Sequence, residues 1–255
     1  MVMYDVQKAS MWKRISAFLF DFIMMSILAV GLGFILSSAL NYTQHAAEME
    51  QLYTQYELTF GVDFDISSED YAALTHDARA AYDNATQALS RDEAFVRVYS
   101  LLINFTLIII TFSILFAHLL LEFLVPLLFK NGQTLGKKIF GIGVMREDGV
   151  RLSPLLLFAR TVLGKATVET LLPVLIVVMV YFGYIGFFGT VLLLALALIQ
   201  LGLLIATRYH TPIHDKLAQT VTVDFASQMI FDSPEALLEY KKRLQAERAN
   251  APEQK

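Results

Sequence analysis

Long apolar runs alternate with polar stretches along this chain. A helix needs roughly 20 apolar residues to cross about 30 Å of hydrocarbon. Four runs reach or approach that length, and they cover residues 15–40, 99–129, 168–184 and 190–206. Glycines at 183, 186 and 189 separate the last two runs, whereas one helix over 168–206 would be far too long for a single span. The pattern predicts an all-α membrane protein, a bundle of four transmembrane helices.

The first apolar run raises the alternative of a cleaved signal peptide. Its length exceeds the 7–15 apolar residues of a signal sequence, although Ser37-Ser-Ala39 offers a weak processing site. We therefore interpret residues 15–40 as an uncleaved first span.

Charge divides the polar segments into two kinds. Segment 41–98 carries eleven acidic residues against three arginines, while segment 130–167 carries seven basic residues against two acids. The ends, 1–14 and 207–255, are also rich in lysine and arginine. Because basic loops stay in the cytoplasm, the pattern predicts a cell-membrane protein with both termini cytoplasmic and segment 41–98 outside. The segment 168–206 then forms the last two spans, joined on the outside.

The amino-acid composition further narrows the possible classes of protein. The chain has 255 residues, of which 56% are hydrophobic and 17% charged, and its mean hydropathy is +0.53. It has no cysteine, so disulfides and cysteine-bound metals or clusters are excluded. The lipid bilayer is the expected surrounding, and nothing in the charge pattern indicates nucleic-acid binding.

The polar segments carry their own structural signals. In the outer one, Ser67 and the capping-box sequence Ser90-Arg-Asp-Glu93 are typical helix starts, which predicts a helical insert with one helix from Ser67 to about Leu89. On the inner side, Lys138–Met145 reads as a strand before an Asp-Gly turn, and Thr220–Val223 as a second strand. We predict that they form one small cytoplasmic sheet. Ser153-Pro154 opens a short amphipathic helix that suits the membrane surface.

Ionisable residues within spans are costly and are functional candidates by default. Asp21 lies seven residues after Arg14, on nearly the same helical face, and His118 shares a face with Glu122 four residues later. Asp21 and Glu122 lie at similar depths from the cytoplasmic side. Two carboxylates facing each other in a low dielectric could share a proton or cation, which makes Asp21, Glu122 and His118 a candidate ion site. The alternative is that each acid only bonds a partner that fixes helix packing.

Other motifs do not indicate chemistry. Gly132-Gln-Thr-Leu-Gly136-Lys137 has the wrong spacing for a phosphate loop, so we interpret it as a turn with lysines at the lipid head groups. His210 and His214 offer metal ligands, but Pro212 argues against a helix that aligns them. No catalytic set appears, so we expect no enzyme, no metal and no cofactor.

Several segments together resemble the RDD family of membrane proteins, which is named for an arginine and two aspartates. The matching segments are Trp12-Lys-Arg14 through Asp21, Glu122, Gly132 through Val144, Asp148-Gly149, Arg160, and His214-Asp215 through Val223. The resemblance makes Arg14, Asp21 and Asp215 the naming residues. It implies sodium/proton antiport for some members, and regulation or scaffolding of membrane enzymes and quality-control complexes for others.

We therefore expect a transport-type protein, an exchanger of a monovalent cation against protons, that works as a homo-oligomer. The rival is a non-catalytic adaptor for a partner membrane protein. We also expect an interface cluster of Arg14, Arg160, His214 and Asp215, in which Arg14 or Arg160 pairs with Asp215 because an unpaired charge in a partly dehydrated layer is costly.

The topology can be tested with reporter fusions. Reporters placed at residues 70 and 145 should report opposite sides of the membrane, with residue 70 outside, because the charge pattern differs between these segments. Activity of both reporters on one side would contradict the four-span arrangement.

Overall fold

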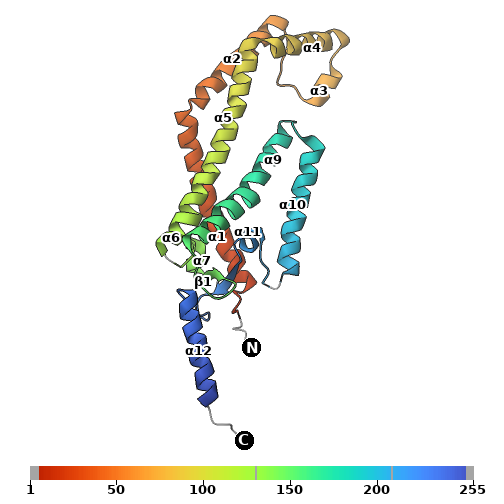
Figure 1. Cartoon of the computed structure of the whole chain (residues 1–255). Coiled ribbons are helices and arrows are strands. Elements are labelled where there is room, and N and C mark those ends of the chain that lie inside the picture. The colour runs from red at the N-terminus through yellow and green to blue at the C-terminus, as the bar shows by residue number, and fades with distance from the viewer. Residues whose placement is uncertain (1–5, 130, 208, 251–255) are drawn as a thin grey trace. The chain divides into compact units, whose positions relative to one another are not determined.

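A computed structural model describes residues 6–129, 131–207 and 209–250 of the chain. Two compact units are present: one comprises the residues up to Val30 and from Ser113 onward, and the other is Gly31–Phe112. Helices α1 (Met11–Ala39) and α5 (Glu93–His118) each contribute to both. Figure 1 shows the order of the elements along the chain.

Four helices in the described part of the chain are long and apolar enough to cross a membrane. They are Met11–Ala39, Glu93–Phe129, Pro154–Tyr181 and Gly186–Ala206. In their most apolar windows only 6% to 22% of the residues are buried within the protein, so most of the apolar side chains are left for lipid. The all-α membrane class predicted from the sequence is confirmed.

The third span differs from the prediction. It is one helix formed by α8 (Pro154–Phe158), the π-helical segment η2 (Ala159–Leu171) and α9 (Leu172–Tyr181). The expected separate surface helix and a span starting near residue 168 are therefore wrong. Arg160 and Lys165 looked like surface residues in the sequence, but the structure gives both of them acidic partners, which lets the helix continue through them.

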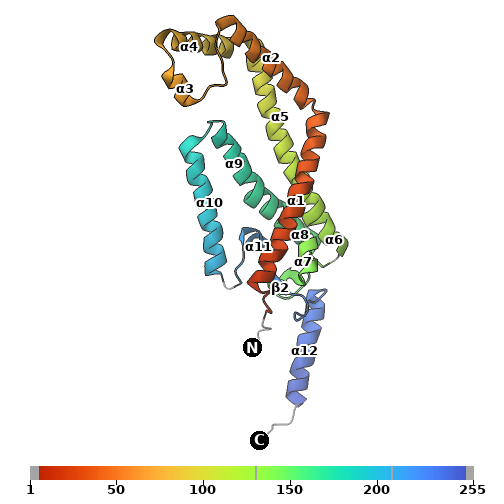
Figure 2. The same cartoon turned by 180° about the vertical axis from the view of Figure 1, so that it is seen from behind.

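The second span also starts earlier than expected, at Glu93 instead of Tyr99, and it too contains a π-helical segment. It consists of α5, η1 (Leu119–Leu124) and α6 (Val125–Phe129). The fourth span, α10 (Gly186–Ala206), lies beside α9, as the two views in Figures 1 and 2 show. Gly183 and Gly186 have positive φ angles of 76° and 36° in the turn between them, which is the conformation that glycine permits.

A two-stranded sheet forms at one end of the first unit. Strands β1 (Ile142–Arg146) and β2 (Thr220–Asp224) are antiparallel, with Val144 opposite Thr222. The predicted pairing of these segments is confirmed, but the strand begins at Ile142 because Lys138 and Ile139 belong to helix α7 (Leu135–Ile139). Thr134 caps α7 by accepting a hydrogen bond from the Lys137 N–H. This cap makes Lys138 and Ile139 helical instead of extended.

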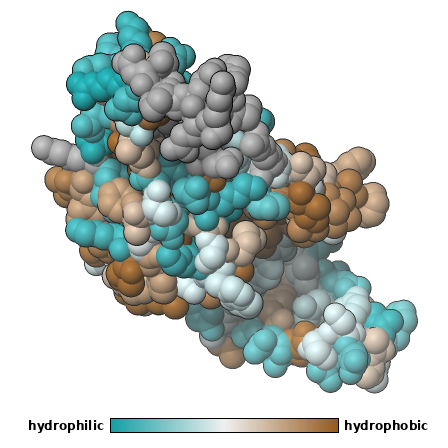
Figure 3. All heavy atoms as spheres, turned by 90° about the horizontal axis from the view of Figure 1, so that it is seen from below, coloured by the Kyte–Doolittle hydropathy of each residue, from teal (hydrophilic) through white to brown (hydrophobic). Residues whose placement is uncertain are grey.

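Two further helices complete this end. Helix α11 (Ile213–Leu217) precedes β2, and α12 (Pro234–Asn250) follows it and projects away from the sheet (Figure 2). Seen from the end at which α12 lies, hydrophilic residues gather over the middle of the surface and hydrophobic residues lie beside them (Figure 3).

The second unit is the helical insert. Its helices are α2 (Tyr42–Phe60), α3 (Ser68–Ala73) and α4 (His76–Arg91), and the rings of Tyr71 and Tyr82 meet edge to face between α3 and α4. Ser67 caps α3 as expected, but the single predicted helix is interrupted because Thr75 caps a new one. Ser90 does not start the next helix; Asp92 does, accepting a hydrogen bond from the Ala94 N–H at 2.7 Å.

The approach of α7 to α1 gives a stability prediction. A Cβ at Gly136 would lie 2.4 Å from the Ala17 carbonyl oxygen, and backbone cannot move aside cheaply. We expect Gly136→Ala to lower the free energy of unfolding by about 1–3 kcal/mol, the usual cost of overpacking. Gly202→Ala is the control, because a Cβ there meets nothing within 4 Å. Thermal unfolding of the purified protein measures both, and equal midpoints would contradict the close approach.

Candidate functional site

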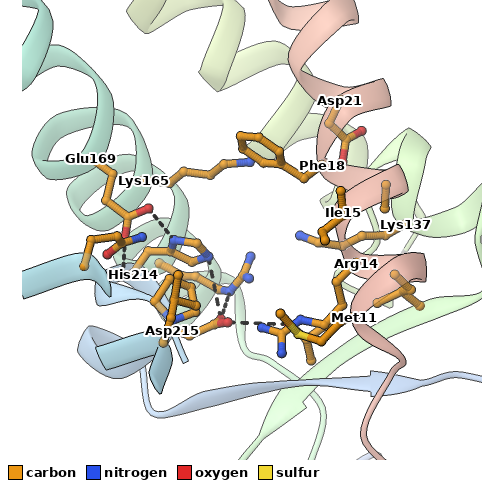
Figure 4. A pocket seen from close by; sticks show the side chains of 17 residues that line it. Met11, Arg14, Ile15, Phe18, Asp21, Lys137, Lys165, Glu169, His214 and Asp215 are labelled. Carbon is orange, nitrogen blue, oxygen red and sulfur yellow. Dashed lines mark hydrogen bonds and ion pairs between the residues drawn. The ribbon is translucent and has the colours of Figure 1, made fainter. Parts of the chain in front are cut away.

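A cavity of about 330 Å³ lies within the first unit. Its wall comes from the first turns of α1, from α7, η2, the end of α10 and α11 (Figure 4). Seven of the seventeen lining residues are apolar, including Met11, Ile15 and Phe18. The ionisable residues that line the cavity are Arg14, Asp21, Lys137, Arg160, Lys165, Glu169, His214 and Asp215.

The most deeply buried ion pair in the site joins Arg160 and Asp215. The Arg160 Nε donates to Asp215 Oδ1 at 2.7 Å, and the two side chains are only 2% and 1% exposed. The Thr220 hydroxyl, at the first residue of β2, donates to the same carboxylate oxygen at 2.7 Å. Burial by itself would raise the pKa of Asp215, but the charge of Arg160 and the hydrogen bonds to the carboxylate act together with its other charged surroundings and lower the pKa below its usual value. This pair fastens the third span to α11 and the sheet.

Arg160, not Arg14, is the residue that pairs with Asp215. Arg14 instead donates from its two terminal nitrogens to the backbone carbonyls of Tyr209 and His210, at 3.4 Å and 2.9 Å. It thereby holds the connection between α10 and α11 against the start of α1. Within the predicted interface cluster, the two arginines consequently have different roles.

His214 is hydrogen-bonded to Glu169 of the third span. The His214 backbone N–H donates to Glu169 Oε1 at 2.7 Å, and the imidazole Nδ1 lies 2.8 Å from Oε2. Burial lowers the pKa of His214, which favours a neutral ring that donates its Nδ1 proton to the carboxylate. Gly164 allows this contact, because a Cβ there would lie 2.7 Å from the His214 Cβ.

Asp21 and Glu122 both lie inside the protein, with 8% and 1% exposure, but they form no bond with each other. Asp21 accepts hydrogen bonds from the Thr134 hydroxyl at 2.5 Å and from the Gly136 N–H at 2.8 Å. Glu122 pairs through Oε1 with Lys165, while its Oε2 is buried without a hydrogen-bond partner in the described residues. Each carboxylate therefore has partners of its own, and a proton or cation shared between the two stays a prediction.

His118 belongs to the surroundings of Glu122 and does not line the cavity. Its ring Nδ1 lies 3.0 Å from the Ile114 carbonyl oxygen, so this nitrogen is the donor. Its Nε2 lies 3.4 Å from the Thr170 hydroxyl. The ring thus connects the second span to the third.

Lys137 is the residue that sequence reasoning assigned to the lipid head groups and that the structure turns inward. Its ammonium group points into the cavity (Figure 4) and has no hydrogen bond or ion pair with any described residue. Burial, followed by the charge of Arg160, lowers the pKa of Lys137 to about 8, although Glu122 and Asp21 act in the opposite direction. Lys137 is therefore within electrostatic range of both candidate carboxylates.

Two prolines account for the irregular helix around the site. Pro126 follows Glu122 by four residues, and Pro173 follows Glu169 by four residues. A proline cannot donate to the carbonyl four residues earlier and its ring crowds that carbonyl. Both spans are π-helical just before their proline, and both π-helical segments carry the charged residues. The repeated Glu-x-x-x-Pro pattern was the sequence signal that could have identified Glu169.

Among the described residues, no group of three histidine, cysteine, aspartate or glutamate side chains could hold a metal ion. Thr134 through Ile139 form a capped helical turn against α1 instead of a phosphate loop.

The fold and the site together define a multi-span α-helical membrane protein with a buried charge cluster at one end of its spans. The model of the RDD family matches residues 8–219, and the chain belongs to this family. The match includes every residue of the cavity wall except Thr222, and it ends just before β2. No curated protein and no solved structure matches the chain.

The buried pair leads to a test of stability. Asp215→Asn leaves the Arg160 charge buried without its partner, so we expect a loss of about 3–5 kcal/mol in the free energy of unfolding. Asp224→Asn is the control, because Asp224 pairs with Lys13 on the exposed surface, where ion pairs contribute little. Thermal unfolding in detergent measures both variants; similar small shifts in the two would contradict a structural role for the buried pair.

Proposed function

We propose that this protein is a transport-type membrane protein that exchanges a monovalent cation for protons. The proposal rests on two neighbouring groups that have no hydrogen-bond partner among the described residues: the buried Glu122 Oε2 and the Lys137 ammonium group. An unpaired carboxylate oxygen can ligate a cation, and an unpaired ammonium group can lose its proton. A buried polar atom without a partner, such as Glu122 Oε2, is rare in folded proteins, and its occurrence near an ammonium group that lines a cavity favours a functional role.

The exchange follows from Coulomb repulsion. A cation that reaches Glu122 Oε2 is close enough to Lys137 to repel its positive charge, because Lys137 already senses the charge of Glu122. With a pKa of about 8, Lys137 can release its proton at little cost near neutral pH. Asp21 then stabilises the proton when it returns to Lys137. The proton and the cation compete for one set of carboxylate charges, which is the requirement for exchange.

The orientation and location belong to the same proposal. The basic segments 1–14, 130–167 and 207–255 favour a cytoplasmic side for the cavity and the sheet, in the cell membrane. Four spans are few for a transport pathway, so we propose that the protein works as a homo-oligomer.

A second candidate is a non-enzymatic adaptor that holds a partner membrane protein. Helix α12 favours it, because among its described side chains only Leu237 is buried, while Leu238 is 55% exposed. This candidate predicts specific capture of a membrane partner that is lost when α12 is removed, with the spans still folded.

Flux measurements test the exchange. In liposomes that contain the purified protein, a sodium or potassium gradient should drive proton movement, which an internal pH dye reports. The rate should increase from about pH 7 to pH 9, because a cation binds more readily once Lys137 has lost its proton. Lys137→Gln should remove this pH dependence, and Asp21→Asn should abolish the flux with folded protein roughly unchanged.

Lys138→Gln is the matched control. Lys138 is exposed and lies over the Phe129 ring, 3.8 Å from its centroid, outside the cavity wall. It should leave the flux unchanged. Absence of any cation-dependent proton movement with the unaltered protein, or an equal loss in the Lys138 variant, would refute exchange at this site.

A further inference from the structure

The hydrogen-bonding groups that face the cavity are unequally satisfied. Both oxygens of Asp21 and both oxygens of Glu169 accept hydrogen bonds, and Asp215 accepts from Arg160, Thr220 and Thr222. The acceptors on the carboxylates of the wall are thus already in use.

The hydrogen-bond donors of the cavity wall, in contrast, are not all in use. An ammonium group has three N–H donors and a guanidinium group has five. Lys137 uses none of its donors on a described residue, and Arg160 uses only Nε, so that its two terminal nitrogens have no partner in the described part of the chain. Arg14 bonds only backbone carbonyls there and has no carboxylate at ion-pair distance.

A cavity with free cationic donors and filled acceptors selects a ligand that accepts hydrogen bonds and carries negative charge. Three donors that converge from α1, α7 and η2 fit the three or more oxygens of a phosphate group better than the two of a carboxylate. We propose that this cavity binds the phosphate group of an anionic ligand through Arg14, Lys137 and Arg160. The site does not depend on the proposed exchange of cations, which takes place at Glu122.

The apolar part of the wall indicates the kind of molecule that carries the phosphate. Met11, Ile15 and Phe18 of α1 and Leu204 of α10 also line the cavity. These residues belong to spans whose exposed apolar faces are left for lipid. Basic pockets between transmembrane helices are typical binding places for anionic lipid head groups. A phospholipid could place its phosphate on the cationic groups and its acyl chain along α1, whereas free inorganic phosphate would use only the former.

Lipid retention tests the proposal. The protein is placed in nanodiscs of phosphatidylcholine with a minor share of phosphatidylglycerol, and the lipid that stays bound after gentle extraction is identified by native mass spectrometry. We expect retention of phosphatidylglycerol in preference to phosphatidylcholine. Lys137→Gln should weaken retention roughly tenfold, the effect of losing one charge-assisted hydrogen bond. Lys137→Arg keeps the charge and should restore it.

Two controls separate the cavity from general surface charge. Lys13 and Lys138 are exposed basic residues next to Arg14 and Lys137 in the sequence, and neither lines the cavity. Lys13→Gln and Lys138→Gln should retain phosphatidylglycerol as the unaltered protein does. An equal loss in these variants would overturn the proposal, since it would mean that lipid is held by surface charge alone.

A second measurement uses the unaltered protein and so does not depend on whether a variant folds. Lys137 should be acetylated by acetic anhydride at pH 8, and bound ligand should protect it, as peptide mass spectrometry would detect. Protection by phosphatidylglycerol and not by inorganic phosphate assigns the phosphate to a lipid. Protection by inorganic phosphate assigns it to a free ion. If neither protects Lys137 relative to Lys138, the cavity is not a phosphate site.

Discussion

Burial of the Arg160–Asp215 pair is the constraint on which the rest of the first unit depends. Two opposite charges removed from water must be held close and hydrogen-bonded, because either alone would be strongly destabilising. The pair meets this condition only when the third span, α11 and the first residue of β2 come together. It thereby decides where the sheet lies relative to the helices. The His214–Glu169 contact also joins the third span to α11 and so reinforces the arrangement.

A second buried carboxylate organises the other side of the cavity. Asp21 receives the Thr134 hydroxyl and the Gly136 N–H, so the start of α7 is fixed against α1. This contact requires glycine at 136, since any side chain would collide with the backbone of α1. The same contact turns the next residue, Lys137, inward and gives the cavity its unpaired charge. Arg14, Asp21 and Asp215 thus each hold a different connection at the sheet end of the spans.

The two proposals differ in the groups they use, so evidence for one is not evidence for the other. Cation exchange depends on Glu122 Oε2 and on the proton of Lys137, whereas phosphate binding depends on the free donors of Arg14, Lys137 and Arg160. Lys137 is common to both, and a bound phosphate would stabilise its charged form. An anionic ligand in the cavity would consequently oppose the release of the proton, so the anion would restrain the exchange.

The sequence alone determined the membrane class, the four spans, the pairing of the two strands and the family. These features follow from hydropathy, from local turn and strand signals, and from motifs in a fixed order, none of which requires knowledge of distant contacts. It also narrowed the partner of Asp215 to Arg14 or Arg160, and the structure decided for Arg160. Only the tertiary structure decided that the helix runs on through Arg160 and Lys165, that Asp21 and Glu122 have separate partners, and that Lys137 faces inward. Each of these depends on charges brought together from different helices, and on prolines that change the helical period, so spacing along the chain could not reveal them.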